Sequence, residues 1–193
     1  MVEIMLDLET MGTGPNAAIA QIGAVAFDME KQIVLETLQV YVDLESSVRQ
    51  SGELDVSTIL WWMRQEDSAR AAFDSQLPCT RSIGEALCLF TELVSRHEPV
   101  EDEGVPVWGS GASFDTVILR QAYKHAGMVA PWHFWQDRCY RTIRSEFPGH
   151  PKIEFEGVKH LAVADAMHQA RQLMVMRSWF KTQSLQTDTE LEE

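Results

Sequence analysis

The feature that most constrains this chain is its first apolar run, which ends in two acidic residues. Residues 2–9 read VEIMLDLE, a largely apolar stretch that predicts a buried strand, and a polar break at 12–15 follows it. Asp7 and Glu9 are two positions apart, so both carboxylates project to the same face of that strand. Two carboxylates on one face of a buried strand repel each other, and the arrangement is costly unless a cation lies between them.

The Asp-x-Glu spacing alone is a weak signal, because it recurs elsewhere in the chain. Three further pairs have it, namely Asp28/Glu30, Asp43/Glu45 and Asp188/Glu190. We expect these pairs to be solvated charges of turns or of the tail. Only Asp7 and Glu9 end a continuous apolar strand, so context singles out this pair.

The remaining pattern predicts a mixed sheet covered by helices. Two more strands, at 18–27 and 33–42, form a meander with the first. After them we expect helices at 56–63 and 83–94, a strand at 105–108, and helices at 114–123, 138–147 and 161–180. Residues 181–193 lack periodicity, and we expect them to form a flexible acidic tail.

Composition places the chain among soluble single-domain proteins. Its 193 residues suffice for one compact domain, and 45% hydrophobic content excludes wholesale disorder. No apolar run approaches the ~20 residues of a membrane span. Three cysteines without a CxxC pair, and an acidic N-terminus unlike a signal peptide, lead us to expect a reduced, cytoplasmic location. The net charge of −13 argues against a nucleic-acid binder of the basic-patch kind.

A third candidate carboxylate, Asp115, follows a predicted strand and a turn of small residues, 109–113. It falls in the first turn of the next helix, where an acidic residue can simply complement the helix dipole, a contribution of about 0.5 kcal/mol. The same place, a strand-to-helix turn at the carboxyl end of a sheet, is also where ligand sites of α/β proteins lie. Other functional residues nearby decide between the two interpretations.

His160 and Asp165 are two further candidate functional residues. His97 and Asp102 have the same separation, but Pro99 and several acidic residues near them oppose a regular helix. The segment after His160 is strongly helical, so Asp165 would be rigidly presented and His160 held just before the helix. We therefore group His160 and Asp165 with Asp7, Glu9 and Asp115.

These segments resemble, in order, the three motifs of the DEDDh (DnaQ-like) family of 3′-to-5′ exonucleases. The matching residues are DLET at 7–10, SFD ending at Asp115, and HLAVAD at 160–165. The similarity covers most of residues 2–178, and STILWWMRQ and WHFWQDRCYRT look like the short, free-standing exoribonuclease-like branch of phages and bacteria. Many relatives carry Asn four residues before the middle Asp, where this chain has Gly111.

The resemblance implies an α/β fold of the RNase H-like type, with a mixed five-stranded sheet, in a single exonuclease domain over residues 1–180. It also implies that Asp7, Glu9, Asp115 and Asp165 bind two Mg²⁺ or Mn²⁺ ions, for which carboxylate oxygens are suitable ligands. Two ions roughly 4 Å apart can activate a water and stabilise the leaving 3′-oxygen. His160 would be the general base, because imidazole titrates near neutral pH. The products would be nucleoside 5′-monophosphates.

Aromatic residues are candidates for holding the substrate. Trp61 and Trp62 are adjacent, so on a helix they face about 100° apart, and we expect one in the core and one exposed. An exposed Trp can stack on a base or form a protein contact, and the sequence leaves both open. Thr10 and Met11 in and beside DLET, and Phe114 beside Asp115, are candidates to border the terminal nucleoside, with the core as the alternative place for Phe114.

Arg138, Arg141 and Arg144 recur every three residues and predict a basic stripe along a helix face. Such a stripe can follow phosphates, or it can pair with nearby acids as a solvated face. The expected partner is a single-stranded or 3′-overhang nucleic acid, RNA or DNA, and a homodimer is expected from the apolar, Trp-rich surface. The alternative function is a catalytically silent binding module on the same fold, which the intact set of five residues disfavours.

Overall fold

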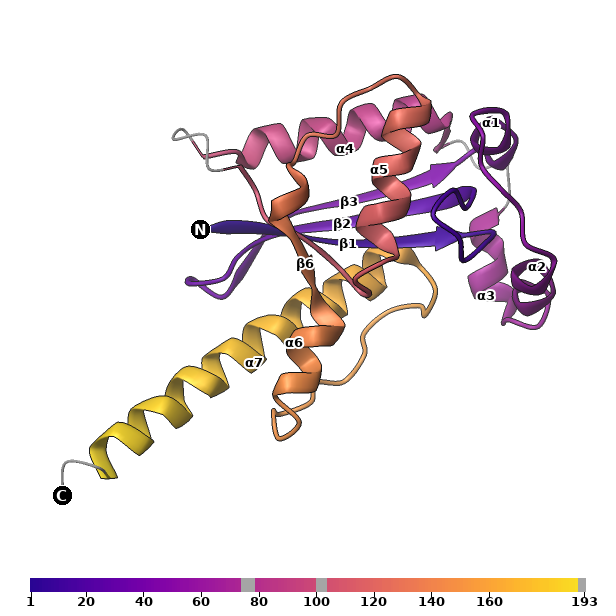
Figure 1. Cartoon of the computed structure of the whole chain (residues 1–193). Coiled ribbons are helices and arrows are strands. Elements are labelled where there is room, and N and C mark those ends of the chain that lie inside the picture. The colour runs from indigo at the N-terminus through magenta and orange to yellow at the C-terminus, as the bar shows by residue number, and fades with distance from the viewer. Residues whose placement is uncertain (74–78, 100–103, 191–193) are drawn as a thin grey trace.

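The computed structural model describes residues 1–73, 79–99 and 104–190. Six strands form one sheet in the order β4-β3-β2-β1-β5-β6 (Figure 1). The strands are β1 Val2–Thr10, β2 Ile19–Asp28, β3 Ile33–Val42, β4 Thr80–Arg81, β5 Val107–Gly109 and β6 Asp137–Cys139. The helices are α1 Leu44–Arg49, α2 Val56–Trp62, α3 Asp67–Arg70, α4 Ile83–His97, α5 Asp115–His125, α6 Tyr140–Glu146 and α7 Ala162–Glu190, with short 3₁₀ turns η1 Ala71–Phe73 and η2 Phe134–Gln136.

The centre of the sheet is the predicted meander. β1 pairs antiparallel with β2, and β2 pairs antiparallel with β3. β5 lies parallel to β1, and β6 lies parallel to β5. The sheet is therefore mixed, as expected, but the expected count of five strands is wrong. β4 and β6 have only two and three residues, too few to give an alternating pattern in the sequence.

Each face of the sheet has its own layer of helices. Ile4, Leu6 and Leu8 of β1 pack in one core with α4 and α5, whereas Met5 packs in a second core with α7. Figure 1 shows α4 and α5 on one side of the strands and α7 on the other. Because side chains alternate along a strand, Asp7 and Glu9 share the face of Met5 and point to the side of α7.

The start of α7 is fixed against the middle of the sheet. A Cβ on Gly23 of β2 would lie only 2.1 Å from the backbone carbon of Ala162, so any other residue would push the helix away. The side-chain oxygen of Gln21 accepts from Ala162 N over 3.3 Å, and that of Gln39 accepts from Val163 N over 2.9 Å. Two residues of the sheet thus satisfy free N–H groups of the helix N-terminus.

Two predicted helices differ from the observed ones. The helix expected at 138–147 begins at Tyr140, and Arg138 lies in β6, because residues 137–139 pair with β5. The helix expected to end at 180 continues to Glu190, so residues 181–190 are helical; 191–193 lie outside the described residues. No helix among the described residues is long and apolar enough to cross a membrane.

Candidate active site

Asp7, Glu9, Asp115, His160 and Asp165 come together where the carboxyl end of β1 meets the first turns of α5 and α7. Electrostatic interaction links Asp7 with the other three carboxylates and links Glu9 with Asp115 and Asp165. One ligand atom each of Glu9, His160 and Asp165 lies within 4.8 Å of the other two. Sequence reasoning therefore selected residues that are neighbours in space, although up to 158 positions of chain separate them.

Asp115 is fixed by backbone donors from β1 and from the turn after β5. Its Oδ1 accepts from Leu8 N over 3.1 Å, and its Oδ2 accepts from Ser110 N over 2.7 Å. The side chain is only 2% exposed. Burial raises the pKa of Asp115 to about 6, against the opposing effect of the hydrogen bonds from Ser110 and Leu8. Its carboxylate is thus held rigidly beside β1.

His160 and Asp165 form a local unit at the start of α7. The backbone N–H of His160 donates to Asp165 Oδ2 over 2.8 Å. His160 has φ 64°, in the left-handed region that non-glycine residues seldom adopt. Its ring lies edge-on to Trp61 and Trp62, with centroid distances of 5.1 and 5.9 Å. Backbone and ring contacts together fix the imidazole, and such strained positions cluster at functional sites.

Gln169 is a site residue that sequence reasoning missed. Its Nε2 donates to Asp7 Oδ1 over 2.8 Å, and its own Oε1 is buried without a hydrogen-bond partner in the described part of the chain. It follows Asp165 by four positions, so both side chains lie on one face of α7. That spacing was the available signal, but it carries meaning only once α7 is known to cross β1.

The carboxylates of the site repel one another. Burial, and then the charges of Asp115, Glu9 and Asp165, hold the pKa of Asp7 well above its ordinary value. Burial and the charges of Asp165 and Asp115 raise the pKa of Glu9 to about 8. Burial also raises the pKa of Asp165. Repulsion of this kind is relieved by a divalent cation, and the all-oxygen donor set suits Mg²⁺ or Mn²⁺.

A hollow of about 420 Å³ lies beside the carboxylates. Its lining residues come from β1, the turn after it, α2 and the start of α5: Leu8, Glu9, Thr10, Gly12, Thr13, Ser57, Thr58, Trp61, Trp62 and Phe114. Phe114 lines this hollow and also packs, as a half-buried ring, against the core on the side of α4 and α5, so both alternatives for it stay open. Met11 is not among these lining residues: it is buried against Ala18 and Trp62, so contact with a nucleoside stays a prediction for this residue.

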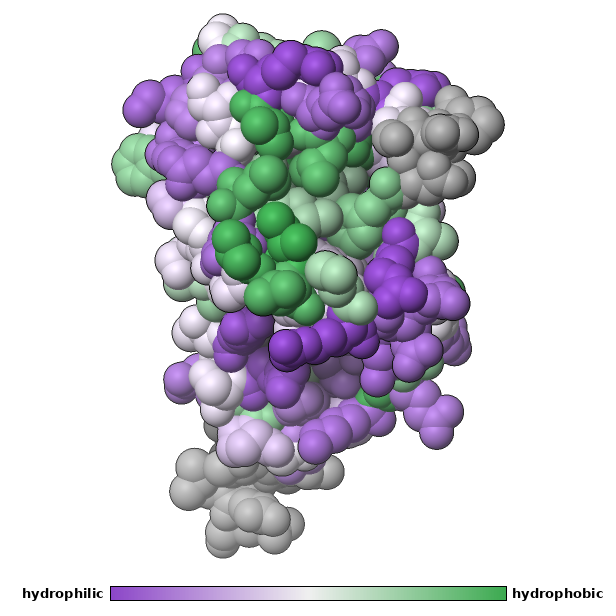
Figure 2. Space-filling model, turned by 90° about the vertical axis from the view of Figure 1, so that its right-hand side faces the viewer, coloured by the Kyte–Doolittle hydropathy of each residue, from purple (hydrophilic) through white to green (hydrophobic). Residues whose placement is uncertain are grey.

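Of the two adjacent tryptophans, one is buried and one is exposed, as predicted. Trp62 is 4% exposed and donates its indole N–H to the carbonyl of Thr10 over 3.0 Å, whereas Trp61 is 43% exposed. Figure 2 shows an apolar band on the face of the molecule that carries α1, α2 and α3. Exposed apolar side chains of α1, α2 and their flanking segments are Val48, Leu54, Val56, Leu60 and Met63.

The predicted basic residues lie on two elements rather than along one helix face. Arg138 is on β6, and Arg141 and Arg144 are on α6, so the predicted helical stripe is wrong. All three are exposed, and none forms an ion pair with a carboxylate in residues 1–73, 79–99 or 104–190. The positive charge of Arg141 lowers the pKa of Asp115, which places this guanidinium close to the site.

Residues 2–177 match the family described as the 3′-5′ exoribonuclease Rv2179c-like domain. The chain belongs to this family. It is accordingly a 3′-to-5′ exonuclease, as the motifs predicted.

Members of related groups share parts of its sequence and its fold. An exodeoxyribonuclease of Enterobacteria phage T4 is 29% identical over 74% of this chain and 70% of that protein. The nuclease domain of 3′hExo, a DEDDh family member solved with bound rAMP, has a TM-score of 0.60 at 14% identity over 92% of both chains. Exonuclease I has a TM-score of 0.64 at 16% identity, covering 92% of this chain but 41% of its own. The predicted RNase H-like fold is confirmed.

This member of the Rv2179c-like family differs from many DEDDh relatives at Gly111. A Cβ at this position would meet only Phe114 Cβ, at 3.5 Å, so sterics do not require glycine here. The second His–Asp pair of the sequence, His97 and Asp102, is separate from the site. His97 Nε2 lies 3.0 Å from Glu36 on the surface, and Asp102 lies outside the described residues.

Proposed function

We propose that this protein is a metal-dependent exonuclease that releases nucleoside 5′-monophosphates from the 3′ end of single-stranded or 3′-overhang RNA or DNA. The observation that carries the proposal is the convergence of four mutually repelling carboxylates and one histidine beside an open hollow. Asp7, Glu9, Asp115 and Asp165 would hold two Mg²⁺ or Mn²⁺ ions. When bound, such ions supply Lewis-acid stabilisation of the charge that develops on the phosphate.

His160 is the residue proposed to take the proton of the attacking water. Its backbone bond to Asp165 and the edge-on contacts of its ring with Trp61 and Trp62 hold the side chain, and within the described ranges its ring nitrogens form no hydrogen bond. A general base needs such a free nitrogen within reach of the water. Because His160 also groups with Glu9 and Asp165 within ligand distance, a role as metal ligand is the alternative that the mutants below distinguish.

The hollow is the proposed place of the terminal nucleoside. Trp61 and Phe114 offer rings for a base, and the hydroxyls of Thr10, Ser57 and Thr58 line the same space as hydrogen-bonding groups for a sugar. The 3′hExo nuclease domain was solved bound to rAMP, which supports a mononucleotide as the product class. The Rv2179c-like family is one of exoribonucleases, and the phage T4 relative is an exodeoxyribonuclease. The proposal therefore includes both RNA and DNA as substrates.

A matched set of oligonucleotides tests this proposal. Purified protein with Mn²⁺ is incubated with RNA and DNA of one sequence, single-stranded or with a 3′ overhang, and the products are resolved over time. Stepwise shortening from the 3′ end with release of mononucleotides supports the proposal, and blocked 3′ ends should prevent it. Absence of any cleavage by metal-loaded protein would favour the silent binding module.

The apolar band supports a homodimer as a further part of the proposal. Val48, Val56 and Met63 of α1, of α2 and of the position after α2 are exposed, and Figure 2 shows an apolar band on the face that carries these helices. Contiguous exposed apolar surface is typical of protein contacts. Light scattering should give twice the mass of the 21.9 kDa chain, and Val56→Glu should shift it to the monomer. A monomeric wild-type protein would refute this part alone.

A further inference from the structure

His133, Phe134 and Trp135, at and just before η2, are three consecutive residues with solvent-exposed rings. The proposed mechanism does not use this part of the molecule. Phe134 is 70% exposed and Trp135 is 59% exposed. The His133 and Trp135 rings are stacked at 4.2 Å with an interplanar angle of 10°, and Phe134 packs edge-on to Trp135 at 5.0 Å. Large aromatic side chains are normally buried, so a cluster left in solvent indicates a binding surface. We call residues 133–135 the aromatic platform.

The platform stands on a rigid base. Trp132, just before it, is buried and donates its indole N–H to Asp137 Oδ1 over 2.7 Å. Gln136, just after it, is buried, and its Oε1 accepts from His133 N over 2.7 Å. Arg120 of α5 also donates to Asp137 Oδ1 and lies over the Trp132 ring at 4.6 Å. The rings are therefore held in place before any partner arrives, which reduces the entropy lost on binding.

Positive charge lies next to the platform. Nη1 of Arg138 donates hydrogen bonds to the carbonyl oxygens of Trp135 and Asp137, over 2.9 and 3.0 Å. The guanidinium is therefore fixed beside the Trp135 backbone. Arg120 is neutralised by Asp137, whereas Arg138 forms no carboxylate ion pair with any described residue. In a chain of net charge −13, an arginine without an ion pair beside exposed rings favours an anionic partner that also has flat faces to stack.

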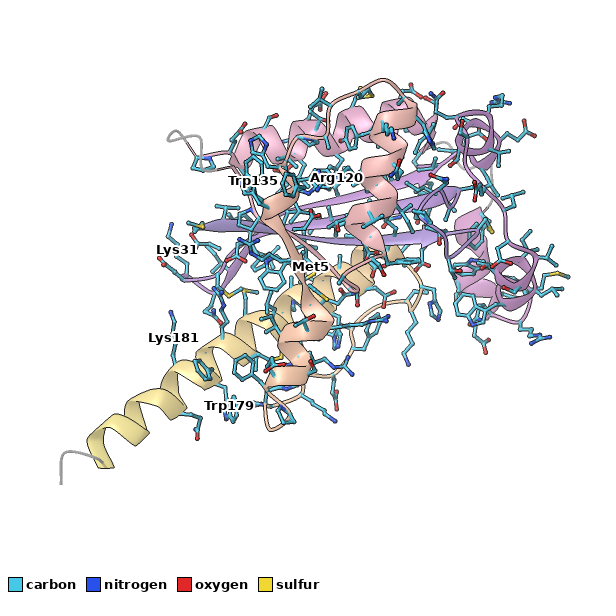
Figure 3. The ribbon with its side chains drawn as sticks, viewed as in Figure 1. Met5, Lys31, Arg120, Trp135, Trp179 and Lys181 are labelled. Carbon is cyan, nitrogen blue, oxygen red and sulfur yellow. The ribbon has the colours of Figure 1, made fainter. Side chains whose placement is uncertain are left out.

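The platform is joined to the active site by one short strand. Asp137 and Cys139 of β6 lie opposite Val107 and Gly109 of β5, and Ser110, the residue after β5, donates to Asp115. β6 thus leads over roughly 10 Å from the platform to the edge of the carboxylate site. Arg138 lies on this path and Arg141 at its end. Figure 3 shows Trp135 at the start of β6, near Arg120, with α6 at the other end of the strand.

We infer that the aromatic platform and Arg138 bind the substrate strand upstream of its 3′ end, by stacking of its bases and contact with its phosphates. The inference rests on the proposed function, because it assigns the upstream part of that substrate. Base stacking on aromatic side chains tolerates every base, so the platform would add affinity for single strands without sequence preference. A duplex buries its base faces, and it would gain nothing from the rings.

Substrates of two lengths distinguish the contribution of the platform from that of the catalytic site. Cleavage is measured for a dinucleotide and for a single strand of about 12 nucleotides. Affinity for the same two substrates is measured by anisotropy, with Ca²⁺ in place of Mn²⁺. Trp135→Ala should weaken binding of the longer strand about tenfold and leave cleavage of the dinucleotide unchanged. Trp135→Phe should retain most of the affinity. Phe180→Ala, which removes an exposed ring from α7, is the matched control and should have no effect.

Charge is tested in the same assay. Arg138→Gln should reduce the slope of log affinity against log salt concentration by the amount expected for about one phosphate contact. Lys124→Gln, which removes an exposed cation from α5, should leave this slope unchanged. Equal binding of the longer strand by wild type and Trp135→Ala would overturn the inference, as would a change in oligomer mass without a change in affinity. Binding that depends on Trp135 in a protein that cleaves nothing would support the platform and refute the proposed function.

Discussion

The backbone N–H of Leu8 donates to Asp115 Oδ1 over 3.1 Å, so the residue between Asp7 and Glu9 is bonded to the third carboxylate of the site. Ser110 N bonds the other oxygen of Asp115 over 2.7 Å. Asp115 therefore has a structural role, as acceptor for two backbone groups, in addition to its proposed role as metal ligand.

Two substitutions of Asp115 separate these roles. Asp115→Asn and Asp115→Ala both remove the charge, and both should abolish cleavage. Asn keeps one acceptor, whereas Ala leaves the buried N–H of Leu8 and the part-buried N–H of Ser110 without one, so Asp115→Ala should be less stable than Asp115→Asn by about 1–3 kcal/mol. Urea unfolding in EDTA measures the difference. Equal stabilities would show that the backbone bonds contribute little.

The stability of metal-free protein should depend on pH through Glu9. Its pKa rises from the ordinary value of 4.5 to about 8 in the folded protein. The folded state thus holds this proton more tightly than the unfolded chain, and the stability it contributes is present below 4.5 and lost as pH rises to about 8. The melting temperature in EDTA should fall over this range. Glu9→Gln should flatten the profile, and the exposed control Glu45→Gln should not.

Divalent cations should reverse this trend. Ions bind the deprotonated carboxylates, so stabilisation by Mn²⁺ should grow with pH over the same range. A melting temperature that does not respond to Mn²⁺ or EDTA at any pH would contradict a metal site built from these residues.

His160→Ala distinguishes a general base from a metal ligand. As a base, His160 should contribute roughly 10²-fold or more to turnover, and its loss should leave Mn²⁺ affinity nearly intact. Asp165→Asn is the matched ligand variant and should reduce Mn²⁺ affinity in calorimetry. A loss of affinity in His160→Ala as large as that in Asp165→Asn would assign His160 to the metal instead.

Gln169→Leu tests the residue that positions Asp7. The amide donates to Asp7 Oδ1 over 2.8 Å, and removal of such a partner of a ligand typically weakens metal binding about 10- to 100-fold. Direct Mn²⁺ titration measures the effect, with cleavage at saturating Mn²⁺ expected to recover. Gln172→Leu is not a suitable control, because it loses bonds to Ile153 and Pro151. Ser178→Leu, at an exposed position of the same helix, serves instead.

Long elements and motif residues could be predicted from the sequence, and contacts across the fold could not. β1 and β3 match the predicted strands closely, because their apolar or alternating runs are long. The opposite burial of Trp61 and Trp62 follows from helix geometry alone. Arg138 was misplaced because a spacing of three fits a helix, whereas pairing with β5 decides the backbone of residues 137–139.

Net charge was the least informative property of the chain. A value of −13 argued against nucleic acid, yet four of the negative charges converge on the proposed metal site, Arg141 lies close to Asp115, and Arg138 of β6 forms no ion pair with a described carboxylate. The average over the whole surface concealed this separation of charge. Gln169 was missed for a related reason, since its contact exists only where α7 crosses β1.

The most direct test of metal-dependent cleavage from the 3′ end is a time course of one single-stranded oligonucleotide, labelled at its 5′ end, with Mn²⁺ and either wild-type protein or Asp165→Asn. We predict a ladder of products that shorten one nucleotide at a time from the 3′ end, nucleoside 5′-monophosphates in solution, and no cleavage by the variant or in EDTA. Cleavage that persists in Asp165→Asn with EDTA, or products that begin within the strand, would contradict this mechanism.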